Sequence, residues 1–191
     1  KLNRLGAPFE TWCLRDVPSI PNLHEIKFFI FATPWEITPE KAELLNRYVL
    51  NHDRTVLWFY APGISDGESF DESRIRRWTG ADPHVSGLSV QRMNGWTSAF
   101  LRNPAELTPA TLKSLAKSAG VHLYSDAEIP VYADDRFLAL HSKEGGTMTI
   151  RLPRRTGRIT ELFSGKLAAE NVSEFQWNFR APDTVLFEME D

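Results

Sequence analysis

The chain has 191 residues, of which 42% are hydrophobic and 25% are charged, and its formal net charge is −3. This apolar fraction is enough for a packed core and excludes a chain that is disordered throughout. The slightly acidic balance argues against nucleic acid and membranes as partners, and no apolar run reaches the length of a membrane-spanning helix. A single cysteine excludes an internal disulfide, and the histidines lack metal-binding spacing, so we expect neither a metal nor a cofactor.

The first 125 residues alternate strand and helix signals, which favours a parallel sheet with helices on both faces. Two nearly continuous apolar runs are typical of strands that are covered on both faces, Ile26–Ala32 and Thr55–Ala61. Weaker strand signals lie at Phe9–Leu14, Leu88–Gln91, Ala99–Leu101 and Val121–Tyr124.

Three helices are predicted from their end signals. Thr38-Pro39 and Thr108-Pro109 each combine an N-cap residue with a proline at the first helical position. Ser69–Glu72 has the pattern of a capping box, and the helix that it starts is expected to end near Trp78, with Gly80 as its C-terminal cap.

The pattern changes at about residue 126, where helix signals stop and short alternating runs begin. These runs predict strands at Val131–Ala133, Phe137–His141, Thr147–Leu152, Ile159–Phe163, Glu174–Phe179 and Val185–Glu188. We therefore expect an α/β domain at 1–125 and a small antiparallel β domain at 126–191, built as a partial sandwich.

No self-sufficient catalytic set is visible. Cys13 lies inside an apolar run, which indicates a buried structural thiol. Gly63-Ile-Ser65-Asp-Gly67 matches the spacing of a nucleophile elbow, but Ser65 comes about four residues after the strand and no helix follows it directly. A small hydrolase that uses Ser65 or Cys13 is therefore the least favoured hypothesis.

The six tryptophans are an excess that needs an explanation. Trp12 and Trp58 lie in strand patterns and Trp78 on a helix, which favours core packing. Trp35 follows a strand end and Trp96 lies in the irregular stretch 81–106, so these two are the candidates for an exposed role. Sugar binding and a subunit interface both explain exposed tryptophans.

Several strings, taken in order, resemble the post-barrel region of large bacterial beta-galactosidase-like glycoside hydrolases, akin to family 42 enzymes. They are Leu5-Gly-Ala-Pro-Phe9, Lys27–Phe31, Val56–Gly63, Trp78-Thr-Gly80, Gly120–Asp126, Phe137–His141 and Thr149–Pro153. The resemblance implies a flavodoxin-like, class I glutamine-amidotransferase-like three-layer domain, often called the trimerisation domain, followed by a small β domain. It also implies that the catalytic glutamates lie on an upstream barrel that these residues do not include.

The resemblance further places a degenerate nucleophile position at Tyr60 and Ala61, where amidotransferases carry a cysteine. It implies that a first strand is missing before Lys1, leaving a gap that another segment or subunit fills unless the sheet is rearranged. Lys1–Arg4 has neither Met nor a signal sequence, so we expect a piece of a longer protein and assign no compartment. The leading hypothesis is a non-catalytic accessory and oligomerisation region that contacts copies of itself or its parent hydrolase. The alternative is a carbohydrate-binding module.

Overall fold

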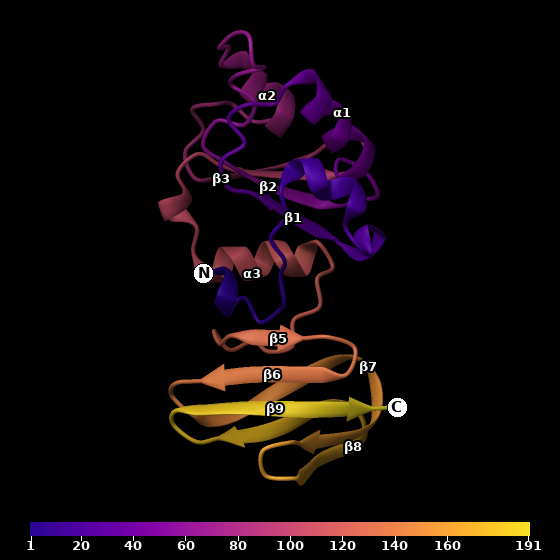
Figure 1. Cartoon of the computed structure of the whole chain (residues 1–191). Helices are drawn as coiled ribbons and strands as arrows, with labels where there is room; N and C mark the ends of the chain where they lie inside the picture. Colours follow the sequence, from indigo (N-terminus) through magenta and orange to yellow (C-terminus); the bar gives the residue numbers. More distant parts are fainter. The chain divides into compact units, whose positions relative to one another are not determined.

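The computed structural model describes the whole chain, residues 1–191, and divides it into two compact units (Figure 1). Thr11–Gly120 form one unit, here called the α/β unit. Lys1–Glu10 and Val121–Asp191 form the other, here called the β unit. An α/β part followed by an antiparallel β part is thus confirmed. No helix has the length and apolar character that crossing a membrane requires.

The α/β unit contains a four-stranded mixed sheet. Its strands are β1 (Phe28–Phe31), β2 (Thr55–Phe59), β3 (Leu88–Arg92) and β4 (Thr97–Leu101). They lie in the order β1-β2-β4-β3, with β1, β2 and β4 parallel and β3 antiparallel to β4. All of β2 is buried, as its continuous apolar run predicts, whereas β1 lies at an edge and is half-buried.

Helices cover both faces of this sheet, α1 and α2 on one side and α3 on the other (Figure 1). On the first face, Val56, Trp58 and Phe100 of the strands form one core with residues of α1 and α2. The helices are α1 (Pro39–Tyr48), α2 (Ser73–Thr79) and α3 (Pro109–Ser118), and short 3-10 helices span Leu14–Ser19, Leu23–Glu25 and Pro104–Glu106.

Local chemistry sets two of the helix starts. The Thr38 hydroxyl accepts from the Lys41 backbone N–H at the start of α1, and the Thr108 hydroxyl accepts from that of Thr111 at the start of α3. The capping box at Ser69 is wrong, because α2 begins four residues later, where the Asp71 carboxylate accepts from the Ser73 N–H at 2.9 Å.

The β unit is one antiparallel sheet in the order β5-β6-β9-β7-β8. Its strands are β5 (Val131–Ala133), β6 (Phe137–Ser142), β7 (Gly146–Glu161), β8 (Lys166–Phe179) and β9 (Asp183–Glu190), and a 3-10 helix spans Leu2–Arg4. The two runs predicted before and after Pro153 join into the single strand β7, whose register with β8 shifts between Arg151 and Thr156.

Two expected strands do not form. In the first, Thr11–Cys13 have no strand partner and Leu14 begins a 3-10 helix. In the second, Tyr124 is held by single bonds instead of a ladder, because its N–H donates to Gly6 and its carbonyl accepts from the Arg151 N–H. Cys13 and Trp12 are exposed, which corrects the expectation that both are buried. The run has no neighbouring strand, so no sheet buries these two residues.

Candidate functional site

The carboxyl ends of the parallel strands place three sequence segments at one edge of the α/β sheet. β2 ends before Tyr60, β1 ends a few residues before Trp35, and β4 ends before Arg102 and Asn103. In open α/β sheets, ligands bind in crevices outside these carboxyl ends. A functional site is therefore expected at this edge of the sheet.

Tyr60 has an unusual backbone conformation. Its φ of 63° lies in the left-handed region, which costs a bulky residue roughly 1–3 kcal/mol. The turn continues at Gly63, where a Cβ atom would lie 2.4 Å from the Trp78 ring, so only glycine fits. The chain thus leaves β2 through a sharp turn that keeps Tyr60 partly exposed at 41%.

Trp35 and Tyr60, two residues singled out from the sequence, lie together here. Their ring centroids are 6.1 Å apart and the rings meet edge to face at 74°. Trp35 is 53% exposed, yet its backbone is held, because its carbonyl accepts from the Ser65 N–H at 3.0 Å. The two rings therefore form an exposed aromatic pair on an ordered backbone.

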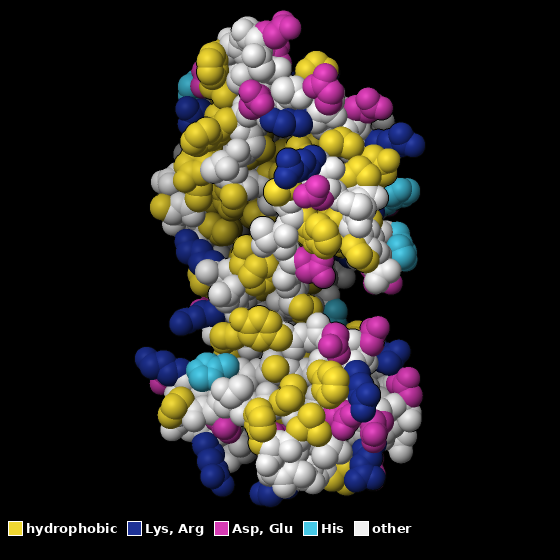
Figure 2. Space-filling model, in the orientation of Figure 1, with side chains coloured by type: hydrophobic (Ala, Val, Ile, Leu, Met, Phe, Trp, Pro, Cys, Tyr) yellow, Lys and Arg dark blue, Asp and Glu magenta, His cyan; other side chains and the backbone are white.

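A hollow of about 380 Å³ adjoins Tyr60. Its other walls are Val85, Gly87, Arg102, Asn103 and Glu106. The Arg102 guanidinium donates to the Pro83 carbonyl, and the Asn103 amide donates to the Glu106 carboxylate at 3.2 Å. Hydrophobic side chains gather over this unit on the side of β3 (Figure 2). The site thus combines an aromatic wall with polar groups that are already oriented.

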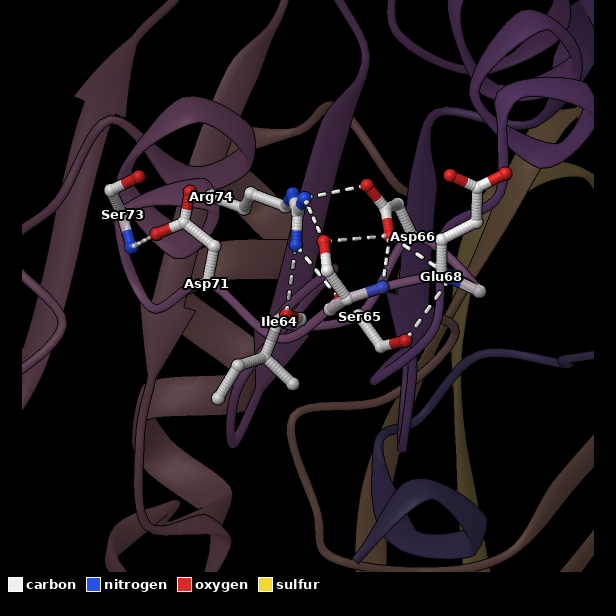
Figure 3. Close-up of polar contacts among 9 residues, drawn as sticks. Ile64, Ser65, Asp66, Glu68, Asp71, Ser73 and Arg74 are labelled. Atoms are coloured by element: carbon white, nitrogen blue, oxygen red, sulfur yellow. Dashed lines mark hydrogen bonds and ion pairs between the residues drawn. The ribbon is translucent and has the colours of Figure 1, made fainter.

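The loop after Tyr60 is ordered by a polar network (Figure 3). The Asp66 carboxylate accepts from the backbone N–H groups of Ser69 at 2.9 Å and Glu68 at 3.1 Å, and it pairs with Arg74. The bonds from Ser69 and Glu68, helped by the charge of Arg74, lower the pKa of Asp66. The loop carries Phe70, which is 83% exposed. A hydrogen-bonded loop, ten residues after Tyr60 in the sequence, therefore exposes a large apolar side chain.

The remaining candidates do not form a catalytic set. Ser65 accepts from the Gly67 N–H of its own loop at 3.1 Å, and no histidine bonds to it. Trp96 does not join Trp35, because it is only 6% exposed and packs edge to face on Trp58 in the core. Ala61 lies against the same core. No group of three or more His, Cys, Asp or Glu residues could hold a metal ion.

Sequence reasoning missed the polar wall of the hollow. Arg102, Asn103 and Glu106 follow a run that gave only a weak strand signal, so nothing in the sequence aligned them with Tyr60. The signal that could have found them is their position just after a parallel strand, beside the end of β2 in the sheet order.

Comparison with known proteins gives matches of fold only. No family model matches the sequence, and no curated protein does either. Among solved structures, the chain is similar to a beta-galactosidase from Bacillus circulans sp. alkalophilus, with a TM-score of 0.61 and 14% identity. That superposition covers 88% of this chain and 34% of the other, so the chain spans about a third of that protein's length.

Two further solved structures are also glycoside hydrolases. A GH42 exo-carrageenase from Bacteroides ovatus gives a TM-score of 0.42 at 14% identity, covering 99% of this chain and 25% of that one. A rhamnosidase from Novosphingobium sp. PP1Y gives a TM-score of 0.47 at 13% identity, covering 85% of this chain and 17% of that one. These two superpose too loosely to carry an argument, and the beta-galactosidase likeness concerns the fold alone.

Proposed function

We propose that this chain is a non-catalytic accessory and self-association region of a beta-galactosidase-like glycoside hydrolase, and that the Trp35–Tyr60 pair is its contact surface. The observation that carries the proposal is this exposed aromatic pair on an ordered backbone at the carboxyl edge of the sheet. Interface centres are enriched in Trp and Tyr. The fold likeness to part of a beta-galactosidase supports the choice of parent protein.

The chemistry at the strand end supports a role without catalysis. A nucleophile needs a base within hydrogen-bond reach, and that base needs a group to orient it. The Tyr60 hydroxyl has no hydrogen-bond partner, while the Ser65 hydroxyl accepts only from the Gly67 N–H of its own loop. Cys13 is exposed on a segment outside the strands. We therefore interpret Tyr60 and Ala61 as an inert remnant of a nucleophile position in an amidotransferase-like fold.

We further interpret the α/β unit as a flavodoxin-like sheet without its first strand. In the flavodoxin-like order 2-1-3-4-5, strands three to five are neighbours both in sequence and in the sheet, and strand one lies beside strand three. The parallel strands β1, β2 and β4 lie side by side in the same way, although β3 comes between β2 and β4 in sequence, and strands one and two of that order have no counterpart. On this interpretation, the free edge of β1 is where a further strand, from another segment or another subunit, pairs.

The free edge can be assigned to particular backbone groups. The Lys27 carbonyl accepts from the Thr55 N–H, so it faces β2, and by alternation Phe28 and Ile30 face away from β2. Amide hydrogen exchange tests the assignment. We expect the Phe28 and Ile30 amides to exchange quickly at low protein concentration and to become protected when the completing strand is supplied. Full protection of both amides at every concentration would contradict an open edge.

An activity assay tests the lack of catalysis. The isolated chain should give no turnover of aryl-glycosides of galactose, glucose or rhamnose, because on this proposal the two carboxylates that glycosidases use lie outside the chain. Robust turnover that is lost in Tyr60→Phe or Ser65→Ala would overturn the proposal and favour a small hydrolase.

A second candidate function, saccharide binding by the same aromatic pair, is favoured by the hollow beside Tyr60. It predicts saccharide-dependent quenching of tryptophan fluorescence that disappears in Trp35→Ala. Trp96→Ala is a poor control, because Trp96 is part of the core and its removal should lower the stability of the fold. Trp177, which packs on Phe187 in the β unit, offers a second fluorophore that should not respond.

A further inference from the structure

A second hollow, of about 250 Å³, lies within the β unit. Tyr124 forms one wall, and the turn after β5 brings Asp134 and Asp135 to another. Arg154 and Thr156 come from the bend in β7, where the register with β8 shifts. Bends of this kind re-aim side chains and are frequent beside functional sites.

Two largely buried residues line this hollow, and the hydroxyl group of each is without a partner. Tyr124 is 7% exposed and Thr156 is 3% exposed, yet neither hydroxyl makes a hydrogen bond within the protein. Both oxygens remain reachable from solvent. The only side-chain polar atoms that are fully buried without a hydrogen-bond partner are Trp58 Nε1 and Ser98 Oγ, which do not line this hollow. Because both hydroxyls are unpaired within the protein and reachable from solvent, both are available to a ligand that enters the hollow.

The acidic residues beside them play different parts. Asp134 Oδ1 accepts from the backbone N–H groups of Arg136 and Phe137, at 2.8 and 2.6 Å, and so holds the turn. Asp135 makes no hydrogen bond or ion pair, so both of its oxygens are free to accept. Arg154 is already paired with Asp191 at 3.3 Å. The free groups of the hollow are therefore hydroxyl donors and one carboxylate, with no free cation.

This set selects among ligand classes. An anionic ligand would meet two carboxylates and no unpaired positive charge. Burial and the charges of Asp135 and Asp134 raise the pKa of Tyr124, so its phenol stays protonated and can donate a hydrogen bond. A protonated amine has only donors, so it offers no acceptor for this phenol. An uncharged polyol both donates and accepts, and Met189 offers an apolar surface for its C–H groups.

We propose that this hollow binds one uncharged pyranose unit of a saccharide. The Tyr124 and Thr156 hydroxyls donate to its oxygens, and the Asp135 carboxylate accepts from a neighbouring pair of its hydroxyls. The site lies wholly in the β unit and shares no residue with the Trp35–Tyr60 pair. It is a site in addition to the proposed contact surface, and the two can fail independently.

Nuclear magnetic resonance titration of the full chain with methyl β-D-galactopyranoside, glucopyranoside and xylopyranoside tests the proposal. We expect at least one of these probes to shift the backbone amide signals of Tyr124, Asp135 and Thr156. Tyr124→Phe keeps the buried ring and removes one hydrogen bond, so it should weaken binding about tenfold. Asp135→Asn, on the exposed turn, should weaken binding by a similar factor.

Tyr132→Phe is the matched control, because Tyr132 lies on β5, is exposed and is not part of the hollow, so affinity should not change. D-galacturonate should bind at least about tenfold more weakly than the methyl galactoside. The proposal is wrong if none of the three pyranosides shifts these signals, if Tyr124→Phe and Asp135→Asn bind as the unchanged protein does, or if galacturonate or methylamine binds as tightly.

Discussion

The two units contain turns that are built in the same way but lie in different surroundings. In the α/β unit, Asp66 accepts from the backbone N–H groups two and three residues ahead and from the Ser69 hydroxyl. In the β unit, Glu161 does the same with Phe163, Ser164 and the Ser164 hydroxyl. Each turn presents an exposed phenylalanine, Phe70 or Phe163.

The difference between the turns lies in how the carboxylate is neutralised. Asp66 is partly exposed and pairs with Arg74. Glu161 is 4% exposed, has no ion pair and depends on its hydrogen bonds alone. Leaving a buried charge without its partners costs more than breaking a surface ion pair. We therefore expect Glu161 to contribute more to the stability of the β unit than Asp66 contributes to that of the α/β unit.

Removal of the buried carboxylate has the largest expected effect. Glu161→Ala leaves two backbone N–H groups and a hydroxyl without their acceptor, so we expect a loss of about 2–4 kcal/mol in the free energy of unfolding. Chemical denaturation followed by circular dichroism measures the loss. Glu170→Ala, an exposed site on β8, is the matched control and should stay within about 0.5 kcal/mol. An equal effect of the two changes would refute the comparison.

Acid should unfold the β unit through the same group. Burial raises the pKa of Glu161, but the hydrogen bonds from the Ser164 hydroxyl and from the Phe163 and Ser164 N–H groups outweigh burial and lower the pKa overall. Because the folded-state pKa is lower, this stability is present above the ordinary value of about 4.3 and is lost as the pH falls below it. Denaturation midpoints between pH 6 and pH 3 test this. A Glu161→Gln protein should lose less stability over that range, and an identical decline would contradict the account.

Removal of the serine hydroxyl from each turn should give the smallest loss in the free energy of unfolding, and it compares the two turns directly. Ser164→Ala removes a 2.5 Å bond to a buried carboxylate and should cost about 1 kcal/mol. Ser69→Ala removes a 3.4 Å bond to Asp66 and a 2.9 Å bond from Arg74, but these groups are partly exposed and Arg74 still pairs with Asp66 directly, so the loss should be smaller than in Ser164→Ala. Thermal unfolding of both variants, measured side by side, checks the order, and a larger loss for Ser69→Ala would reverse the comparison.

Local chemistry made part of the fold predictable. Thr38-Pro39 and Thr108-Pro109 mark the helix starts, because the threonine caps and the proline begins the helix within the same first helical turn. Ser69–Glu72 has an equally good local pattern, yet the prediction fails because Arg74 and Asp66 bind the Ser69 side chain instead. A competing contact from outside the motif is not visible in the motif itself.

The candidate site was predictable only in part. Trp35 was a candidate because it comes shortly after a predicted strand, and Tyr60 because the family resemblance placed a nucleophile position there; the structure brings their rings together. Trp96 lies in a weakly patterned stretch, and its burial against Trp58 depends on pairing between β2 and β4. The same pairing places Arg102 beside Tyr60, so neither outcome could be obtained without the sheet order.

Sedimentation velocity of the full chain over a range of concentrations tests whether the Trp35–Tyr60 pair is a contact surface. We expect concentration-dependent association, with a dissociation constant raised at least about tenfold in Trp35→Ala and unchanged in Phe163→Ala, which removes an equally prominent ring from the β unit. A chain that stays monomeric at all concentrations, or that associates equally well without Trp35, would contradict it.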